Sequence, residues 1–282
     1  MSDLIRHRAA VLGRPVEHSL SPVIHAAGYR AVGLDDWAYT RIDCGAEDLP
    51  WIVADAPAEF AGFSVTMPGK FAALAVAREV THRARAIGSA NTLVRIPGGW
   101  RADNTDCEGV SAALGELGVG NPAAGDRAVL VGAGGTARPA LWALGRAGFR
   151  AVTVINRSDR SAELAPLADT LGIDVRWTVS DPERAATAVT GAAVVISTVP
   201  SAALAGMEDD LARVPVLDVI YDPWPTPLAR AAADNGVPVV GGDVMLAGQA
   251  LSQFEQFTGK PAPRDAMRAA LTAALRDRSC GA

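Results

Sequence analysis

The sequence predicts an α/β protein of two domains, the second built on a parallel sheet that helices cover on both faces. Three observations support this. From Arg127 onward, short continuous apolar segments alternate with amphipathic helical segments, which is the pattern of parallel strands joined by crossover helices. The earlier part of the chain also alternates strand and helix patterns, but it contains a hairpin signal. From about Met245 the pattern is helical, with no further strand.

The first domain is expected to combine strands, helices and one hairpin. Its strand patterns are short apolar segments bounded by turn residues, and its helix patterns carry apolar residues on one face. The strands are predicted at Ala9–Gly13 and Ala61–Val65, the helices at Pro22–Val32 and Lys70–Glu79, and the hairpin strands at Asn91–Ile96 and Trp100–Asn104, joined by Pro97, Gly98 and Gly99.

The second domain begins after a loop rich in Gly and Pro at Leu117–Asp126. Its predicted elements are a strand at Arg127–Val131, a helix at Thr136–Ala147, a strand at Ala151–Ile155, a helix near Ser161–Leu171, and strands at Ala193–Ser197, Val216–Ile220 and Val237–Val240. The helices after Met245 are expected to fold back onto the first domain. We therefore expect one domain at 1–106, completed by 243–282, and a second at 107–242.

The composition is that of a globular protein and excludes several classes of partner. The chain is 49% hydrophobic and 20% charged, and its net charge of -5 argues against nucleic acid as the main partner. Neither a signal peptide nor an apolar segment long enough to span a membrane is present. Three scattered cysteines fit a reducing cytoplasm and predict neither a disulfide framework nor a metal site. They are Cys44, Cys107 and Cys280.

A glycine-rich turn between the first strand and first helix of the second domain predicts a dinucleotide site. Small residues there let the backbone approach a pyrophosphate, and the helix N-terminus supplies free N–H groups and the positive end of a dipole. Because the turn lies within a strand–helix–strand unit, it predicts a Rossmann-type, doubly wound domain. The residues of the turn are Gly132, Ala133, Gly134, Gly135, Thr136 and Ala137.

The end of the next strand favours NADP over NAD. Proteins that bind NAD place a carboxylate there for the ribose hydroxyls, and a carboxylate would repel a 2′-phosphate. This chain has Asn156, Arg157 and Ser158 instead, followed by Asp159 and Arg160. A guanidinium and a hydroxyl can hold the phosphate, so NADP is the expected cofactor.

Two segments of the first domain suggest a polar substrate. Ser21 is predicted to cap a helix that Pro22 opens, and with Ser19 it places two hydroxyls where a substrate carboxylate could bind. Lys70 follows a turn and opens a helix, a position at which a cation is disfavoured and therefore invites a functional explanation.

The hairpin brings a third polar group to the domain junction. If Gly98 and Gly99 form a two-residue loop, Asn91 lies opposite Asp106, whereas a slip of one residue makes Thr105 its partner. In both registers an amide and a carboxylate converge where the chain leaves for the cofactor domain. Small-molecule sites favour such junctions.

With these residues in view, the chain resembles the shikimate dehydrogenases over nearly its whole length. The resemblance rests on separate motifs in the expected order. They are Gly13-Arg14-Pro15 with His18-Ser19-Leu20-Ser21-Pro22 and His25, Gly62-Phe63-Ser64-Val65-Thr66-Met67-Pro68 with Lys70, Gly88-Ser89-Ala90-Asn91-Thr92-Leu93, Asn104-Thr105-Asp106, the glycine turn with Arg138, Asn156-Arg157-Ser158, Ser197-Thr198 with Pro200, Asp218-Val219-Ile220-Tyr221 with Pro223 and Thr226-Pro227-Leu228, and Gly242 with Met245-Leu246 and Gln249-Ala250.

The resemblance implies an NADPH-dependent oxidoreductase that reversibly reduces 3-dehydroshikimate to shikimate, on the way to aromatic amino acids. Lys70 and Asp106 would be the catalytic pair, Lys70 giving the proton and Asp106 orienting it. The substrate would be bound by Ser19 and Ser21 at its carboxylate, by Thr66, Asn91 and Gln249 at ring hydroxyls, and by Tyr221 beside the nicotinamide. The cofactor residues would include Thr198, Gly242 and Met245 besides the glycine turn and the segment from Asn156 to Ser158.

The chain departs from the family pattern at a few positions, and two other functions remain open. Ala26 and Ser64 stand where the family often has Asn, Cys107 replaces the usual Gly, and Pro139 follows Arg138 in the first helical turn. The alternatives are a quinate/shikimate dehydrogenase that prefers NAD, and a non-catalytic NADP-binding sensor. The sequence is compatible with either a monomer or a homodimer.

Overall fold

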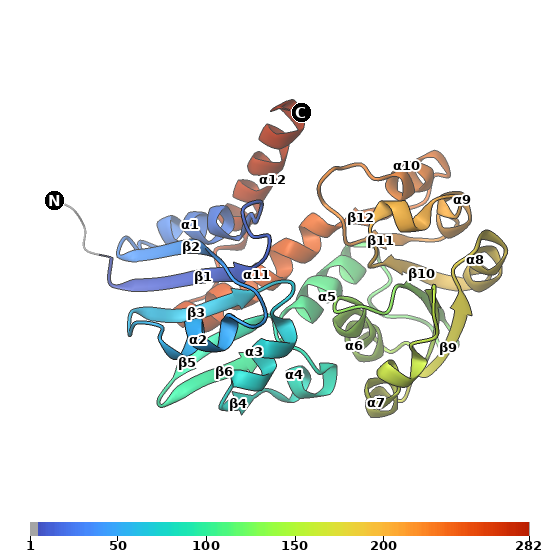
Figure 1. The fold of residues 1–282 in the computed structure, drawn as a ribbon. Coiled ribbons are helices and arrows are strands. Elements are labelled where there is room, and N and C mark those ends of the chain that lie inside the picture. Colours follow the sequence, from blue (N-terminus) through green and yellow to red (C-terminus); the bar gives the residue numbers. More distant parts are fainter. Residues whose placement is uncertain (1–4, 282) are drawn as a thin grey trace. The chain divides into compact units, whose positions relative to one another are not determined.

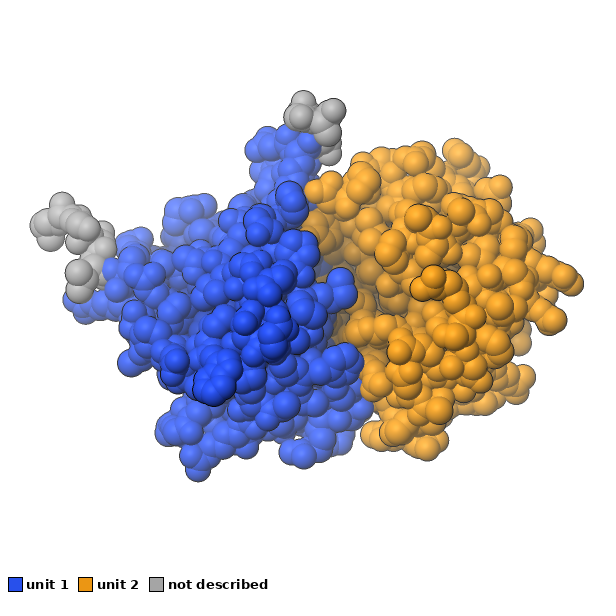
Figure 2. Space-filling model, viewed as in Figure 1, with its two compact units in different colours: residues 1–105, 246–282 blue, residues 106–245 orange. Residues whose placement is uncertain are grey.

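The structure, a computed structural model, describes residues 5–281, apart from the side chains of 279–281. Cys280 therefore lies outside the described side chains. The described chain divides into two compact units (Figures 1 and 2). The first unit contains the residues up to Thr105 and those from Leu246 onward, and the second runs from Asp106 to Met245. Each unit is built around its own six-stranded sheet.

The sheet of the first unit is mixed, with the strand order β2-β1-β3-β5-β6-β4. Strands β1, β2 and β3 are parallel, whereas β5 is antiparallel to both β3 and β6. The strands are β1 (His7–Gly13), β2 (Trp37–Asp43), β3 (Phe60–Val65), β4 (Glu79–Val80), β5 (Thr92–Ile96) and β6 (Gly99–Asp103).

Helices cover both faces of this sheet (Figure 1). Side chains alternate across β3, so Phe63 packs in a core with α2 and α3, while Ser64 faces α11. A Cβ atom at Gly62, on the same face as Ser64, would collide with the ring of Phe257 in α11. The helices are α1 (Ser21–Ala31), α2 (Leu49–Ala54), α3 (Lys70–Val76), α4 (His82–Ile87), α11 (Gly242–Thr258) and α12 (Arg264–Gly281).

Helix α12 packs against α1, as Figure 1 shows, which confirms the expectation that the C-terminal helices return to the first domain. Gly28 of α1 makes this packing close, because a Cβ atom there would lie 2.8 Å from the ring of Phe254 and 3.0 Å from the sulfur of Met267. None of the helices in the described part of the chain is both long and apolar enough to cross a lipid bilayer.

All six strands of the second sheet are parallel, in the order β12-β11-β10-β7-β8-β9. Counted from β7, this is the strand order 3-2-1-4-5-6 of the dinucleotide-binding fold, which confirms the predicted doubly wound domain. The strands are β7 (Arg127–Val131), β8 (Ala151–Asn156), β9 (Asp174–Val179), β10 (Ala192–Ser197), β11 (Val216–Asp218) and β12 (Val239–Gly241).

One face of the second sheet packs against α8, α9 and α10, with Val129, Val195 and Val216 among the buried strand residues. On the other side, α6 packs between α5 and α7 and contacts β7. The helices of this unit are α5 (Asp106–Glu116), α6 (Ala137–Ala147), α7 (Ser161–Leu171), α8 (Pro182–Val189), a short 3-10 helix at Ser201–Leu204, α9 (Glu208–Leu211) and α10 (Pro227–Asp234).

The hairpin of the first unit differs from both predicted registers. Its loop is Pro97–Gly98, one residue earlier than expected, so Ile96 pairs with Gly99 and Thr92 with Asp103. Gly98 takes a φ of +76°, the value that the third position of a type II turn requires, and proline suits the position before it. The expected pairings of Asn91 with Asp106 or with Thr105 as register partners are therefore wrong.

Other differences have local causes. The helix predicted at Lys70–Glu79 ends at Val76, because Glu79 and Val80 pair with β6 as strand β4. Strand β9 escaped prediction because it lies at the sheet edge, and its mostly exposed side chains leave no buried apolar pattern.

The close approach of α5 and the start of α11 within the second unit predicts opposite effects for two alanine substitutions. At Gly109 a Cβ atom would collide with the backbone oxygen of Met245, whereas at Gly115, on the same helix, it would meet no atom within 4 Å. We expect Gly109→Ala to lower the free energy of unfolding by about 1–3 kcal/mol. Gly115→Ala should raise it by about 0.5–1 kcal/mol, because alanine favours a helix. Urea unfolding of both variants measures the difference, and equal effects would contradict it.

Candidate active site

The glycine turn of the second unit packs against Thr198, which follows the neighbouring strand β10. Gly132 follows β7 with a φ of +103°, and a Cβ atom there would lie 2.5 Å from Oγ1 of Thr198. The hydroxyl and the backbone N–H of Thr198 both donate to the carbonyl of Val131, at 2.8 and 2.9 Å. Strands β7 and β10 are neighbours, and the strand order reverses between them. Open α/β sheets bind ligands at this reversal.

The rest of the turn leaves room beside its backbone. No atom lies within 4 Å of a Cβ placed on Gly134 or Gly135, and neither residue has a positive φ. Neither packing nor backbone conformation therefore requires glycine at these two positions, and the space beside them is open to a ligand. Thr136 makes no capping hydrogen bond through its side chain, and the first turn of α6 carries no acidic residue. These residues fit the pyrophosphate of a dinucleotide.

The segment after β8 presents an exposed cation. The side-chain amide of Asn156 donates to the carbonyl of Ser158 at 2.9 Å and so bends the chain around Arg157, which is exposed. Asp159 accepts from the N–H and hydroxyl of Ser161 at 2.8 and 2.6 Å, and these bonds lower its pKa. The acidic residue of this segment is thus tied to the start of α7.

Thr198, Tyr221, Gly242 and Met245 lie in segments that follow the carboxyl ends of strands in the second sheet, as the glycine turn does. Because the strands are parallel, the segments after β7, β8, β10, β11 and β12 all begin at the same end of the sheet. Gly242, which opens α11, donates its N–H to Ile220 at 3.0 Å, and a Cβ atom there would collide with the carbonyl of Val219. Tyr221 is half-buried, and Met245 and Asp106 are buried.

In the first unit, Ser21 does not act as the predicted N-cap. Leu20 occupies that position with a helical backbone, and α1 begins at Ser21 itself. The hydroxyl of Ser19 accepts from the N–H of Ser21 at 3.3 Å, and Arg41 donates two hydrogen bonds to the carbonyl of Ser19, at 3.1 and 2.6 Å. Both serines therefore lie at one helix end, in a segment that a guanidinium holds.

Thr66 and Lys70 belong to one turn that leaves β3. The N–H of Thr66 donates to Leu12 at 2.9 Å, and Lys70 is the first residue of α3. The carbonyl of Lys70 accepts from the N–H of Ala90 at 3.0 Å, which ties the lysine to the residue before Asn91. A Cβ atom at Gly13 would collide with the side chain of Thr66, so the loop after β1 also packs here.

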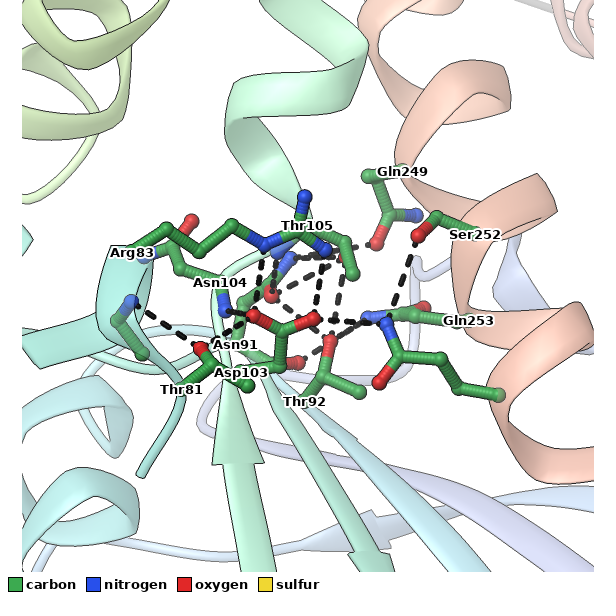
Figure 3. A network of polar contacts seen from close by, with 12 residues as sticks. Thr81, Arg83, Asn91, Thr92, Asp103, Asn104, Thr105, Gln249, Ser252 and Gln253 are labelled. Carbon is green, nitrogen blue, oxygen red and sulfur yellow. Dashed lines mark hydrogen bonds and ion pairs between the residues drawn. The ribbon is translucent and has the colours of Figure 1, made fainter.

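Asn91 is buried at the centre of a polar network, which Figure 3 shows. Its Oδ1 accepts from the N–H of Thr105 at 2.7 Å and from the hydroxyl of Thr92 at 2.8 Å. Its Nδ2 donates to Oγ1 of Thr105 at 3.0 Å and reaches Oε1 of Gln249 at 3.5 Å. The structure thus brings together Asn91 and Gln249, two of the three residues predicted to bind ring hydroxyls.

The network continues through Gln253 and Tyr39, which the sequence did not single out, and through Ser64, where the family often has Asn. Gln253, one turn after Gln249 on α11, donates to the carbonyl of Asn91 at 3.1 Å and to the hydroxyl of Thr92 at 3.0 Å. Its Oε1 accepts from Ser64 at 2.7 Å, and Ser64 accepts from Tyr39 at 2.6 Å. The four-residue spacing of the two glutamines was the available signal, because it places both on one helical face.

A buried carboxylate anchors the hairpin beside this network (Figure 3). Arg83 binds Asp103 through two hydrogen bonds of 2.7 and 2.6 Å, and Thr81 and Gln256 donate at 2.7 and 2.8 Å. Burial alone would raise the pKa of Asp103, but the hydrogen bonds from Arg83, Thr81 and Gln256 outweigh it and lower the pKa to about 2.

His25 is buried on the same side of the sheet, with its ring stacked on Tyr39 at a centroid distance of 4.2 Å. Burial lowers the pKa of His25 to about 3, against a smaller opposite effect of Gln253. The imidazole is therefore neutral in the folded protein and forms part of an aromatic cluster with Phe254 and Phe257.

The predicted residues thus fall into two groups. The first unit contains Ser19, Ser21, Thr66, Lys70, Asn91 and Gln249, and the second contains Asp106, Tyr221, Met245 and the nucleotide-binding residues. Within the described part of the chain, no cluster of three or more His, Cys, Asp or Glu side chains could hold a metal ion.

Comparisons with known proteins identify the family. Residues 11–93 match the shikimate dehydrogenase substrate binding domain, and residues 244–272 match the shikimate 5'-dehydrogenase C-terminal domain. The shikimate dehydrogenase (NADP(+)) of Methylobacterium radiotolerans is 39% identical over 280 residues, covering 96% of this chain and 95% of the relative. The chain belongs to the shikimate dehydrogenase family. This confirms the resemblance found in the motifs.

Solved structures agree with this assignment. The shikimate dehydrogenase of Mycobacterium tuberculosis is 50% identical, with a TM-score of 0.88, and the match covers 95% of this chain and 99% of that one. A shikimate 5-dehydrogenase from Thermus thermophilus, in complex with NADP(H) and shikimate, is 32% identical with a TM-score of 0.79 and covers 95% and 99% of the two chains. The shared architecture therefore extends over nearly the whole chain.

The buried His25 predicts a loss of stability in acid. Its pKa in the folded protein, about 3, lies below the unfolded value of about 6.5, so the unfolded chain binds the proton more tightly. As the pH falls from about 6.5 towards 3, this residue should reduce the free energy of unfolding by about 1.4 kcal/mol per pH unit. Urea unfolding between about pH 7 and about pH 4, the range in which the unfolded histidine takes up its proton, measures the slope.

The control for this prediction is His25→Phe, which keeps a ring beside Tyr39 but cannot titrate. Its acid slope should be smaller than that of the parent protein. An identical slope in the two proteins would show that protonation of His25 does not cause the loss.

Proposed function

We propose that this protein interconverts shikimate and 3-dehydroshikimate, using NADP(H) as the hydride carrier. The match of almost the whole chain to NADP(+)-dependent shikimate dehydrogenases carries the proposal. The open backbone of the glycine turn and the exposed Arg157 support NADP, and the polar network around Asn91 supports a substrate rich in hydroxyl groups. The protein is an oxidoreductase of small molecules, and we place it in the cytoplasm.

In this proposal the first unit holds the substrate. Ser19 and Ser21 bind its carboxylate, because two hydroxyls and the N-terminal end of α1 lie together there and Arg41 adds a positive charge nearby. The ring hydroxyls are bound by Thr66, Asn91 and Gln249. Of these, Asn91 offers a donor and Gln249 an acceptor to the same oxygen.

Lys70 and Asp106 supply the proton chemistry. Bound NADPH supplies the hydride that reduces the carbonyl carbon, and bound NADP⁺ takes it back in the reverse direction. Lys70 donates a proton to the carbonyl oxygen as its negative charge develops, and Asp106 orients the ammonium and helps to return the proton. In this proposal Tyr221 contributes to the site beside the substrate and the nicotinamide.

The composition of the chain supports a chemical role for Lys70. Of its 26 basic residues only Lys70 and Lys260 are lysines, and all others are arginines. A guanidinium is too weak an acid to give up its proton near neutral pH, whereas an ammonium can do so. A chain that uses arginine for almost every positive charge thus has a lysine where proton transfer is proposed.

The second unit binds the cofactor. The turn from Gly132 to Ala137 receives the pyrophosphate, and Arg157 with Asn156 and Ser158 holds the 2′-phosphate of NADP. Thr198, Gly242 and Met245 lie at the same sheet edge and complete the site on the nicotinamide side. The lowered pKa keeps Asp159 ionised, but its bonds to Ser161 direct it to the helix.

Substitution of Lys70 tests the catalytic assignment. Lys70→Ala should lower kcat by roughly 10²–10⁴-fold, and Lys70→Arg should also be impaired, because it keeps the charge but cannot transfer the proton. Asp106→Asn should be impaired as well. The assay follows the formation of NADPH from shikimate by its absorbance, with Lys260→Ala, at an exposed position, as the control. Normal turnover in Lys70→Ala would refute the assignment.

The choice of cofactor has its own test. Arg157→Ala should raise KM for NADP by about 10- to 100-fold while changing KM for NAD little, because a charged hydrogen bond to phosphate contributes about 1.5–3 kcal/mol. Arg160→Ala is the matched control, since Arg160 is paired with Glu163 at 2.8 Å. Equal effects of both substitutions would contradict a specific role for Arg157.

The same assay separates the two alternative functions. Turnover of quinate with NAD above that of shikimate with NADP would favour a quinate dehydrogenase. Tight binding of NADPH with no oxidation in the presence of 3-dehydroshikimate would favour a sensor.

A further inference from the structure

We propose that a buried relay of four side chains positions Asn91 and fixes which end of its amide faces Gln249. The relay consists of Tyr39, Ser64, Gln253 and Thr92. This inference rests on the proposed function, in which Asn91 and Gln249 bind a substrate hydroxyl. The relay residues act through Asn91 and are positioning residues (Figure 3 shows Gln253, Thr92 and Asn91 together).

The backbone of Asn91 sets the direction of the first half of the relay. Its carbonyl can only accept, so the group of Gln253 that lies 3.1 Å away is the Nε2 donor. Oε1 of Gln253 must then accept the proton of Ser64, at 2.7 Å. Because Ser64 has a single proton and gives it to Gln253, Tyr39 must be the donor in the 2.6 Å bond between their hydroxyls.

The direction of the second half of the relay also follows from the donor Nε2 of Gln253. Nε2 of Gln253 also donates to the hydroxyl of Thr92 at 3.0 Å, so the proton of Thr92 is left for another acceptor. Oδ1 of Asn91, at 2.8 Å, is nearer to this hydroxyl than Oγ1 of Thr105, at 3.2 Å, and accepts the proton. The backbone N–H of Thr105 independently donates to the same Oδ1 at 2.7 Å. Two donors thus hold the oxygen end of the amide, and the Nδ2 end faces Gln249.

The orientation of Gln249 is fixed in the same manner. Its Nε2 donates to the carbonyl of Leu246 at 3.0 Å, so Oε1 is the atom that faces Asn91. The two side chains approach to 3.5 Å, at the long limit of a hydrogen bond. A hydroxyl can accept from Nδ2 and donate to Oε1 at once, which a keto oxygen cannot do. The relay therefore favours a hydroxyl at this point of the substrate.

Burial makes the relay rigid. Tyr39 and Ser64 are 8% and 4% exposed, and Thr92 and Gln253 are fully buried, so water competes little for these bonds. Burial also raises the pKa of Tyr39, against smaller opposite effects of Ser64 and Ser21. The phenol therefore keeps its proton and remains the donor that starts the relay.

A pair of substitutions at Thr92 tests the relay with little change of shape. Thr92→Val removes the hydroxyl and should raise KM for shikimate by about two- to tenfold, the usual effect of one lost hydrogen bond. The variant should keep kcat within about twofold of the parent protein and leave KM for NADP unchanged. The lost hydrogen bond lies in the first unit and, in this proposal, affects only how the substrate is bound. Thr92→Ser keeps the hydroxyl and should restore the parental KM.

A second site shows whether the bonds act as one chain. Gln253→Met retains the length of the side chain without its hydrogen bonds and should raise KM for shikimate in the same direction. The double variant Thr92→Val/Gln253→Met should be no worse than the more affected single variant, because both interrupt one path. Additive effects would overturn the relay.

The remaining outcomes separate this inference from the proposed function. If Asn91→Ala raises KM for shikimate but Thr92→Val does not, the relay is refuted and the binding role of Asn91 stands. If Asn91→Ala leaves KM unchanged, the binding role itself is refuted. If Thr92→Ser is as impaired as Thr92→Val, the effect is one of packing, which also overturns the relay. Circular dichroism of every variant confirms that each has folded.

Discussion

The hydrogen-bond network of the first unit is built around the buried Asn91. Its carbonyl accepts from the N–H of Val65 at 2.7 Å, and its own N–H donates to Asp103 at 3.1 Å, so the residue joins β3 to the hairpin through its backbone. A buried polar group that lacks a partner is costly, and each oxygen and nitrogen of Asn91 has one. The backbone and side chain of Asn91 therefore join β3, the hairpin and α11 through hydrogen bonds.

The second unit achieves its geometry by other means. At the carboxyl ends of its strands the backbone packs closely, because glycine at Gly132 and Gly242 lets neighbouring strands and turns approach more closely than a side chain would allow. The helix that follows the turn contributes its N-terminal N–H groups. Side-chain hydrogen bonds thus hold the polar side of the first unit together, whereas in the second unit glycines allow the backbone segments to pack closely.

The elements that could be predicted from sequence were those with a strong local signal. Strand β7 and helix α6 follow from apolar runs and a glycine turn, and their predicted bounds agree with the structure to within a residue. Strand β9 and the register of the hairpin could not be read in this way. The first has no buried face, and the second depends on which residue of Pro97-Gly98-Gly99 takes a positive φ at the tip.

The site shows the same division. Asn91, Lys70 and Gln249 could be predicted because they lie in recognisable motifs, and the glycine turn could be predicted from its composition. Tyr39 had no signal in the sequence, and the contacts of Gln253 could not be predicted, because they join residues up to 189 positions apart. Spacing along one helix hinted at Gln253, but only the packing of α11 against β3 shows what it touches.

The division of the chain also orders events during synthesis. The second unit is continuous from Asp106 to Met245, so every strand of its sheet is synthesised before α11 is complete. The first unit must wait for the segment from Leu246, which brings Gln253 to Asn91 and Phe254 to Gly28. A nascent chain can therefore complete the second unit first, whereas the face of the first sheet that carries Ser64 lacks its cover by α11 until translation reaches the final helices.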